Sequence, residues 1–429
     1  MGDPDADKVN AYRATGPGLL QRGRDRGRRA LGSVGPGLIS GASDIDPTTV
    51  GTMAVIGATT VYALGWLAWL LFPMLAVVLI IATRLAGVGQ RDLQQCVRDR
   101  YGPIPQWLLL ASIVVVNIVT ISADARAGGA ALGLLVHYDS PWFTILIAGA
   151  ALALLLWGNM RQVQRVLKYV LLCLLAYPIA AVTAGPDWGR VFSGIFYPHV
   201  SLAGNYISGA LALLGTTITS YVYVWQTIEV AEERPSRRML RYRNTEAAAA
   251  MFITIAVMWF ILVATGATLG THHEQINTAQ QAASALAPIA GSYASYVFGA
   301  GLLASALVAL PVLIATTGHV IAAQLSAPRG LSTPVTEAPA YYATASVSTV
   351  IAVAVSLVGI SPIRVLFVAS IIGGLATPIG LAALIVTGSD PRIMGRDAVR
   401  GGLLVVGWAV TGVITLLSIV YLVQQVIGG

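Results

Sequence analysis

The sequence predicts an all-α membrane protein of about eleven transmembrane helices, arranged as two inverted five-helix repeats and one additional helix. Of its 429 residues, 56% are hydrophobic and only 10% are charged, and the mean hydropathy is +0.74. No soluble domain has this composition. Apolar segments of spanning length recur along the chain, and two of them, five spans apart, are interrupted by residues that favour a break in the helix.

The eleven predicted spans are apolar stretches of roughly the length that a helix needs to cross a bilayer. They are residues 34–58, 61–83, 105–136, 141–158, 164–184, 206–232, 246–270, 291–324, 340–359, 362–388 and 401–425. The two longest, 105–136 and 291–324, must tilt or extend beyond the hydrocarbon core.

The distribution of basic residues supports this count. When Lys and Arg are assigned to alternate loops, 23 of the 26 basic residues fall on one side. Only Arg190 and Arg364 fall on the other side, and Arg126 falls within a span. The positive-inside rule then places the amino terminus in the cytosol and the carboxyl terminus outside, in a cytoplasmic (inner) membrane. A net charge of +7 that follows the membrane topology indicates lipid contact rather than a nucleic-acid partner.

The ends of the chain and its cysteines add little chemistry. Residues 1–33 hold seven basic and four acidic residues and read as a mobile basic cytosolic tail. We expect no cleaved signal peptide, because the first apolar run starts late and spans the bilayer. Cys96 lies in a loop and Cys173 in a span, so neither a disulfide nor a thiolate metal site is indicated.

The first interrupted span contains two acids and a proline, Asp44, Asp46 and Pro47. A carboxylate at membrane depth is costly unless it faces a cavity or a partner, so it usually marks a substrate path. Pro47 removes a backbone hydrogen bond and favours a break beside Asp46. Backbone groups freed at membrane depth need polar partners, and together with the carboxylate they make a candidate cation site. The alternative is a proline kink with a hydrogen-bonded carboxylate inside a helix bundle.

The second interrupted span, 206–232, has a middle rich in small hydroxyl residues, from Gly215 to Ser220. Five spans separate the two breaks, and an odd number gives the two copies opposite orientations. Paired broken helices in inverted halves are typical of secondary transporters, whose substrate binds near the midplane. The predicted units are a first repeat over 34–184, a second over 206–388 and an eleventh helix over 401–429.

Several motifs resemble the NRAMP (natural resistance-associated macrophage protein) family of proton-coupled divalent metal transporters, and most closely a divergent bacterial branch similar to its magnesium transporters. The resemblance runs over nearly the whole membrane part and implies a LeuT-type fold with helices 1 and 6 interrupted. The motifs that carry it are Gly35-Pro36-Gly37, Asp46-Pro47, Arg84-Leu85, Arg91-Asp92-Leu93, Gly215-Thr216-Thr217-Ile218, Trp225-Gln226, Glu229 and Ser389-Asp390-Pro391-Arg392.

The chain departs from the family pattern at the metal-binding motifs. The family's Asp-Pro-Gly-Asn is Asp46-Pro47-Thr48-Thr49 here, and Thr219, Ser220 and Tyr221 stand where the family has Met-Pro-His. Loss of the soft methionine sulfur leaves oxygen ligands, which suit Mg²⁺ or Mn²⁺. The predicted ligands are the Asp46 carboxylate, the hydroxyls of Thr49 and Thr219, and the backbone carbonyls near Ser43 and Thr216. We expect weak proton coupling, because a phenol, with a reference pKa of about 10, is neutral at physiological pH.

Four other ionisable positions are candidates for a supporting or coupling role. Asp44 reads equally well as a proton-handling carboxylate and as a vestibule residue. Asp124 and Arg126 are two residues apart, so they do not face each other but can pair with a neighbouring helix. Glu229 is a candidate for the inner gate or a solvated helix end.

Three of the histidines, His272, His273 and His319, are not predicted to bind metal. His272 and His273, with Glu274, are expected in a solvated external loop. His319 is expected to be isolated in its span and packed rather than involved in proton transfer.

Other classes of function remain as alternatives. Loss of the metal motifs leaves open a small organic substrate such as an amino acid, held by half-helix amino termini. A sensor built on a transporter fold also remains open. An enzyme is not expected, because the sequence has no HExxH motif, no nucleotide-binding loop and no Ser-His-Asp set that fits one pocket. We expect no cofactor beyond a transported ion, and no obligate protein partner.

Overall fold

Every regular element in the part of the chain that the structure describes is a helix. The structure is a computed structural model and describes residues 45–157, 176–233, 237–272, 276–330 and 333–427. The predicted tail over 1–33, the first part of the first span and most of the fifth span lie outside the described residues.

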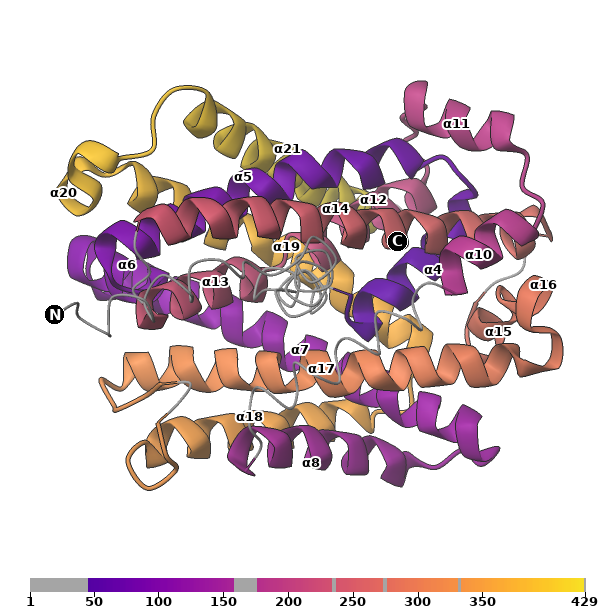
Figure 1. Cartoon of the computed structure of the whole chain (residues 1–429), viewed down its shortest axis with the longest axis horizontal. Coiled ribbons are helices and arrows are strands. Elements are labelled where there is room, and N and C mark those ends of the chain that lie inside the picture. The colour runs from indigo at the N-terminus through magenta and orange to yellow at the C-terminus, as the bar shows by residue number, and fades with distance from the viewer. Residues whose placement is uncertain (1–44, 158–175, 234–236, 273–275, 331–332, 428–429) are drawn as a thin grey trace, which may run out of the picture.

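The α-helices follow one another along the chain with short connections (Figure 1). They are α4 (Pro47–Thr60), α5 (Gly65–Gly89), α6 (Leu93–Tyr101), α7 (Pro103–Val136), α8 (Pro141–Trp157), α10 (Ala176–Thr183), α11 (Trp188–Phe196), α12 (Gly204–Thr217), α13 (Ser220–Glu233), α14 (Arg237–Thr268), α15 (Ala279–Ser284), α16 (Ala287–Ala290), α17 (Ala294–Gln324), α18 (Pro339–Ser356), α19 (Pro362–Ser389), α20 (Pro391–Met394) and α21 (Gly402–Ile427).

The described part of each of the eleven predicted spans is helical, and the all-α membrane prediction is confirmed. Within the described residues, eight helical segments are long and apolar enough to cross a membrane, and α8 is a shorter apolar helix. Some predicted limits were wrong: α5 continues to Gly89, and α14 begins at Arg237. Hydropathy reports only the part of a helix that meets lipid, whereas these helices continue past the apolar part.

The second predicted break lies where the sequence places it, and the helix expected after the first break begins at the predicted position; the residues before Ile45 lie outside the described residues. α4 begins at Pro47, a residue favoured in the first turn because its missing N–H would have no helical partner there. The other break separates α12, which ends at Thr217, from α13, which begins at Ser220. The interrupted helices therefore end and begin inside the molecule rather than at its surface.

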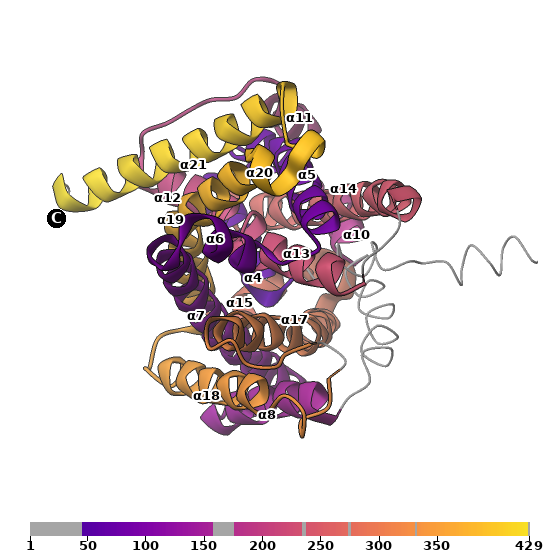
Figure 2. The same ribbon diagram turned by 90° about the vertical axis from the view of Figure 1, so that its left-hand side faces the viewer.

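The long helices form layers around α4 (Figures 1 and 2). α7 and α17 pack along each other, and α18 and α8 lie on their outer side. α4 packs against α12, α14 and α19 in the interior. α21 lies at the periphery in Figure 2, and most of its surface is exposed, as expected of a helix that faces lipid.

Gly215 allows the second break to sit close to α19. A Cβ at Gly215 would lie 2.1 Å from the backbone oxygen of Ser370 and 2.2 Å from the nitrogen of Gly374. Only a residue without a side chain fits between these two backbones. The glycine therefore sets the distance of α12 from α19.

Several short helices outside the spans were not predicted. α6 begins with a capping box, in which Asp92 accepts from the Gln95 backbone and the Gln95 side chain accepts from the Asp92 backbone. The signal Asp-x-x-Gln was present in the sequence, but hydropathy does not detect a polar helix. α11 is amphipathic, and its Phe192 and Phe196 are exposed, as in a helix that lies at a membrane interface.

A polar contact joins α6 to the end of α19. Asp390 caps α20 and accepts hydrogen bonds from Arg100 Nε at 2.6 Å and the Tyr101 hydroxyl at 3.0 Å. The backbone N–H of Arg392 lowers the pKa of Asp390 from its usual value, and Arg100 and Tyr101 lower it further. This carboxylate is therefore more stable in its charged form in the folded protein than in the unfolded chain.

Candidate functional site

Asp46 lies fully buried at the amino end of α4. Its Oδ1 accepts the backbone N–H of Thr49 at 2.6 Å, and its carbonyl accepts the N–H of Val50 at 3.1 Å. The side chain is thus the cap of α4 and satisfies a backbone donor that has no partner within the helix. Oδ1 is the carboxylate oxygen used in this way.

The second break meets the first at this carboxylate. The Tyr221 hydroxyl, in the first turn of α13, donates to Asp46 Oδ2 at 3.1 Å. The hydroxyls of Thr49 and Thr216 lie 2.9 Å apart in a hydrogen bond between α4 and α12. Residues far apart in the sequence therefore form one buried polar site between the two broken helices.

Two further oxygens lie at the break without a hydrogen-bond partner among the described residues. They are the buried hydroxyls of Thr219 and Ser220. Burying a hydroxyl without a partner costs free energy, which a cation or its water ligands can recover. The donors in this region are all oxygens, the set that hard divalent cations prefer.

Neighbouring helices hold the backbone of both breaks in place. Ser305 of α17 donates to the carbonyl of Ile45, and Thr377 of α19 donates to the carbonyl of Ile218 at 3.1 Å. Such partners are required where a helix is interrupted at membrane depth. The sequence-based interpretation missed Ser305 and Thr377, because neither stands in a recognisable motif.

Asp124 joins the site through Thr48 rather than directly. Its Oδ1 accepts from the Thr48 backbone at 2.9 Å and from the Thr48 hydroxyl at 2.5 Å. Oδ2 of Asp124 has no hydrogen-bond partner within the described part of the chain, and the same holds for Nε of Arg126. Asp124, on α7, is therefore connected to the Asp46 site by a single intervening residue, Thr48. This connecting role of Thr48 was not predicted.

The remaining predicted residues lie further away or outside the described residues. Glu229 lies eight residues beyond Tyr221 on α13, about 12 Å along the helix. Ser43, Asp44, His273 and Glu274 fall in segments that the structure does not describe. Among the described residues, no group of three or more His, Cys, Asp or Glu side chains could hold a metal ion. The candidate site is therefore built from one carboxylate and several hydroxyls.

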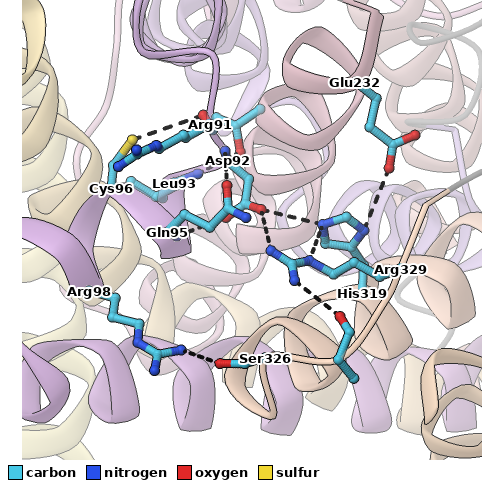
Figure 3. Close-up of polar contacts among 12 residues, drawn as sticks. Arg91, Asp92, Leu93, Gln95, Cys96, Arg98, Glu232, His319, Ser326 and Arg329 are labelled. Atoms are coloured by element: carbon cyan, nitrogen blue, oxygen red, sulfur yellow. Dashed lines mark hydrogen bonds and ion pairs between the residues drawn. The ribbon is translucent and has the colours of Figure 1, made fainter. Parts of the chain in front are cut away.

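The expectation that His319 is isolated was wrong. Its Nε2 lies 3.4 Å from Asp92 Oδ2, its Nδ1 lies 3.9 Å from Glu232 Oε1, and Arg329 Nε donates to Nε2 at 3.3 Å (Figure 3). The three partners come from other segments of the chain, and no spacing in the sequence brings them together.

The surroundings of Asp92 favour its charged form. Burial alone would raise the pKa of this carboxyl, but the hydrogen bond and the charge of His319 lower it. The Gln95 backbone N–H and the Arg329 guanidinium add to that effect, and the pKa of Asp92 lies below its usual value. Asp92 is therefore a stable anion at the base of this cluster.

The fold and the buried site define the class of this protein. A multi-pass helical membrane protein in which two broken helices face each other across a polar site is a secondary transporter of the LeuT type. The chain belongs to the Nramp family: the model described as natural resistance-associated macrophage protein-like matches residues 37–424. It is therefore a transporter and not an enzyme.

Curated relatives match the chain over nearly its full length. The divalent metal cation transporter MntH of Deinococcus radiodurans is 26% identical over 444 residues, covering 99% of this chain and 97% of the relative. The transporter of the same name from Bradyrhizobium diazoefficiens is 26% identical, covering 94% and 91%.

Solved structures agree on the fold. The Eremococcus coleocola manganese transporter, in complex with an aromatic bis-isothiourea compound, has a TM-score of 0.70 at 18% identity, covering 91% of this chain and 86% of that one. MhsT in complex with L-phenylalanine has a TM-score of 0.59 at 13% identity, covering 91% and 97%. The LeuT-type prediction is thereby confirmed.

Proposed function

We propose that this protein moves a divalent metal cation across the cytoplasmic membrane by alternating access, with Mg²⁺ and Mn²⁺ favoured over softer metals. The relatives that match over nearly the full chain are named divalent metal cation transporters. The alternative of an organic substrate is not favoured, because the neighbour in complex with an amino acid is less similar than the manganese transporter.

The observation that carries the choice of ion is the oxygen-only donor set at the two breaks. Asp46 supplies the single charge, Thr49 and Thr219 supply hydroxyls, and the backbone near Thr216 supplies a carbonyl. Ser43 is included in the proposal from the sequence alone. A shell without sulfur or imidazole removes the advantage of soft ions, and a single carboxylate suits an ion that keeps some of its water ligands.

Supporting roles follow from the contacts around this shell. Tyr221 and Ser220 lie at the start of α13, beside Asp46, where they can hydrogen-bond to water ligands of the ion. Asp124 contacts the site through Thr48 and is the second carboxylate available for coupling. Three roles are proposed from the sequence: Asp44 lies in the vestibule, Arg126 lies near the pathway, and Glu229 lies at the inner gate.

The orientation in the membrane is part of the proposal. The segregation of basic residues supports a cytosolic amino terminus and an external carboxyl terminus. It also supports the division into a tail over 1–33, repeats over 34–184 and 206–388, and an eleventh helix over 401–429. The only partners proposed are the transported ion and membrane lipid.

Calorimetry of the purified protein with Mg²⁺, Mn²⁺ and Cd²⁺ tests the donor set. We expect Mg²⁺ and Mn²⁺ to bind to the wild type. Thr219→Met should raise the affinity for Cd²⁺ relative to Mg²⁺ by about tenfold or more, because only the softer ion gains from a thioether. Thr219→Val is the matched control: it removes the hydroxyl, keeps the shape and adds no sulfur.

Two results would contradict the proposal. One is an absence of heat with all three ions together with binding of an amino acid. The other is an equal gain of Cd²⁺ affinity in Thr219→Val and Thr219→Met, which would show that the sulfur does not reach the ion.

A further inference from the structure

The cluster around His319 lies at the end of the molecule that we place in the cytosol. Its side chains come from four segments: Asp92 precedes α6, Glu232 ends α13, His319 belongs to the last turns of α17, and Arg329 follows α17 (Figure 3). All four line a cavity of about 610 Å³. The His319 and Asp92 side chains are only 5% and 7% exposed, so their charges are poorly screened by water.

The ring nitrogen Nε2 of His319 faces two groups that make opposite demands. Arg329 Nε, 3.3 Å away, can only donate, and it needs a lone pair on Nε2. Asp92 Oδ2, 3.4 Å away, can only accept while charged, and it needs a proton on Nε2. The two hydrogen bonds exclude each other, so the cluster has two states that differ by the position or presence of one proton.

The other ring nitrogen faces α13. Nδ1 is buried and has no hydrogen-bond partner among the described residues, while Glu232 Oε1 lies 3.9 Å from it. A neutral ring that accepts at Nε2 already carries its proton on Nδ1, so protonation adds a positive charge rather than a new donor on this side. The positive charge strengthens the attraction between the ring on α17 and the Glu232 carboxylate on α13.

The other groups around the ring do not replace this attraction. α18 contributes Tyr341, whose backbone packs on Gly318 and whose hydroxyl is buried. α7 meets α17 through a neutral contact, the Asn117 amide donating to Thr317. Cys96 of α6 lies beyond Asp92. Within the described part of the chain, the charged groups that face His319 are thus Asp92, Glu232 and Arg329.

Both helices joined by the cluster also reach the Asp46 site. Tyr221, which bonds to Asp46, and Glu232 are eleven residues apart on α13, about 17 Å along the helix. Ser305, which bonds to Ile45, and His319 are fourteen residues apart on α17, about 21 Å. The same two helices therefore connect the His319 cluster with the two breaks.

We infer that His319 is a proton-binding site at the cytosolic mouth, and that its protonation ties the end of α13 to α17 through Glu232. The neutral ring accepts from Arg329 and leaves α13 less restrained. The protonated ring pairs with Asp92 and Glu232 and restrains α13, together with the Tyr221 hydroxyl at its other end. Cytosolic acidification is therefore the signal to which this site responds.

A native reporter of this movement is Trp225 on α13. It packs against a buried cluster that includes Ala315 and Ala322 of α17. Its environment changes if α13 moves against α17. We would label the full-length protein with 5-fluorotryptophan, place it in nanodiscs without any metal, and record ¹⁹F spectra across the histidine range. Trp225→Phe assigns its signal among the nine tryptophans.

We expect the Trp225 signal of the wild type to shift in a single step as the pH is lowered. His319→Gln, which stays neutral, should abolish this shift. His137→Gln is the matched control, because His137 lies at the carboxyl end of α7, away from the His319 cluster, and contacts Tyr296. The Trp225 signal of this variant should shift as it does in the wild type.

Glu232→Gln keeps the His319 ring but removes the carboxylate from α13. It should reduce the amplitude of the pH-dependent Trp225 shift at least about threefold. A wild-type signal that does not depend on pH, or an unchanged shift in His319→Gln or Glu232→Gln, overturns the inference. No ion is present in the experiment, so it fails or succeeds independently of the transported substrate.

Discussion

Asp46 caps a helix and supplies the only charge of the proposed ion site, and two substitutions separate these roles. Asp46→Asn removes the charge but keeps the shape. Its Oδ1 can accept the Thr49 N–H, and its Nδ2 can donate to the Tyr221 oxygen. Asn and Asp are about equally good caps. We therefore expect Asp46→Asn to unfold within about 1 kcal/mol of the wild type.

Asp46→Ala removes both roles. The lost cap costs about 1 kcal/mol, and losing the hydrogen bond from the Tyr221 hydroxyl to the charged carboxylate costs about 1.5–3 kcal/mol. The free energy of unfolding should thus fall by about 2.5–4 kcal/mol. Divalent binding should be lost in both variants, by at least about a hundredfold in affinity, or about 2.7 kcal/mol.

The assay pairs metal uptake in proteoliposomes with thermal unfolding of the same preparations. The expected pattern is no uptake by either variant, with Asp46→Asn as stable as the wild type and Asp46→Ala less stable. Uptake by Asp46→Asn at the wild-type rate would refute the assignment of Asp46 as the ion ligand. Equal stability of Asp46→Ala and the wild type would refute its role as the cap of α4.

Three other outcomes are expected. Gly215→Ala should prevent folding or cost more than about 3 kcal/mol, because its Cβ would lie 2.1 Å from a backbone oxygen of α19. Gly209→Ala should be tolerated, because its Cβ would meet a flexible leucine side chain at 3.1 Å. Equal expression and melting of the two variants would contradict this. Asp390 has a lowered pKa, so it stabilises the fold above its unfolded pKa of about 3.9, and this stabilisation is lost as pH falls through the folded value. Asp390→Asn should therefore melt below the wild type at neutral pH and approach it in acid; a constant difference between the two melting curves would contradict the linkage. Tyr221 stands where the family has a histidine, and the reference pKa of a phenol is about 10, so metal uptake should acidify vesicles weakly or not at all; metal-dependent quenching of a trapped pH dye would contradict this.

The spans and both breaks could be predicted because their signals are local. A run of apolar residues identifies a membrane helix wherever it packs, and Asp46-Pro47 disfavours a continuous helix by its own backbone chemistry. The oxygen character of the site followed in the same way from the residue types at each break. The motif resemblance then placed the two breaks in one fold.

The contacts between segments could not be predicted in this way. Thr48 contacts Asp124 across 76 positions, and His319 contacts Asp92 across 227. Neither pair has a characteristic spacing, because the packing of α7 on α4 and of α17 on α6 brings them together. A lone histidine in an apolar span was therefore interpreted as a packed side chain, although its partners are charged.

The capping contact of Asp46 also sets how strongly the site can hold an ion. The amino end of α4 carries a partial positive charge equivalent to about half an elementary charge, and the Asp46 carboxylate lies directly on it. An approaching cation therefore experiences little more than half of the carboxylate charge. A transporter must release the ion as readily as it binds it, because a site that binds too tightly limits the rate of transport. In the proposed site, the helix that positions the carboxylate also weakens the attraction of this carboxylate for a cation. The backbone of α4 thereby favours rapid release of the ion.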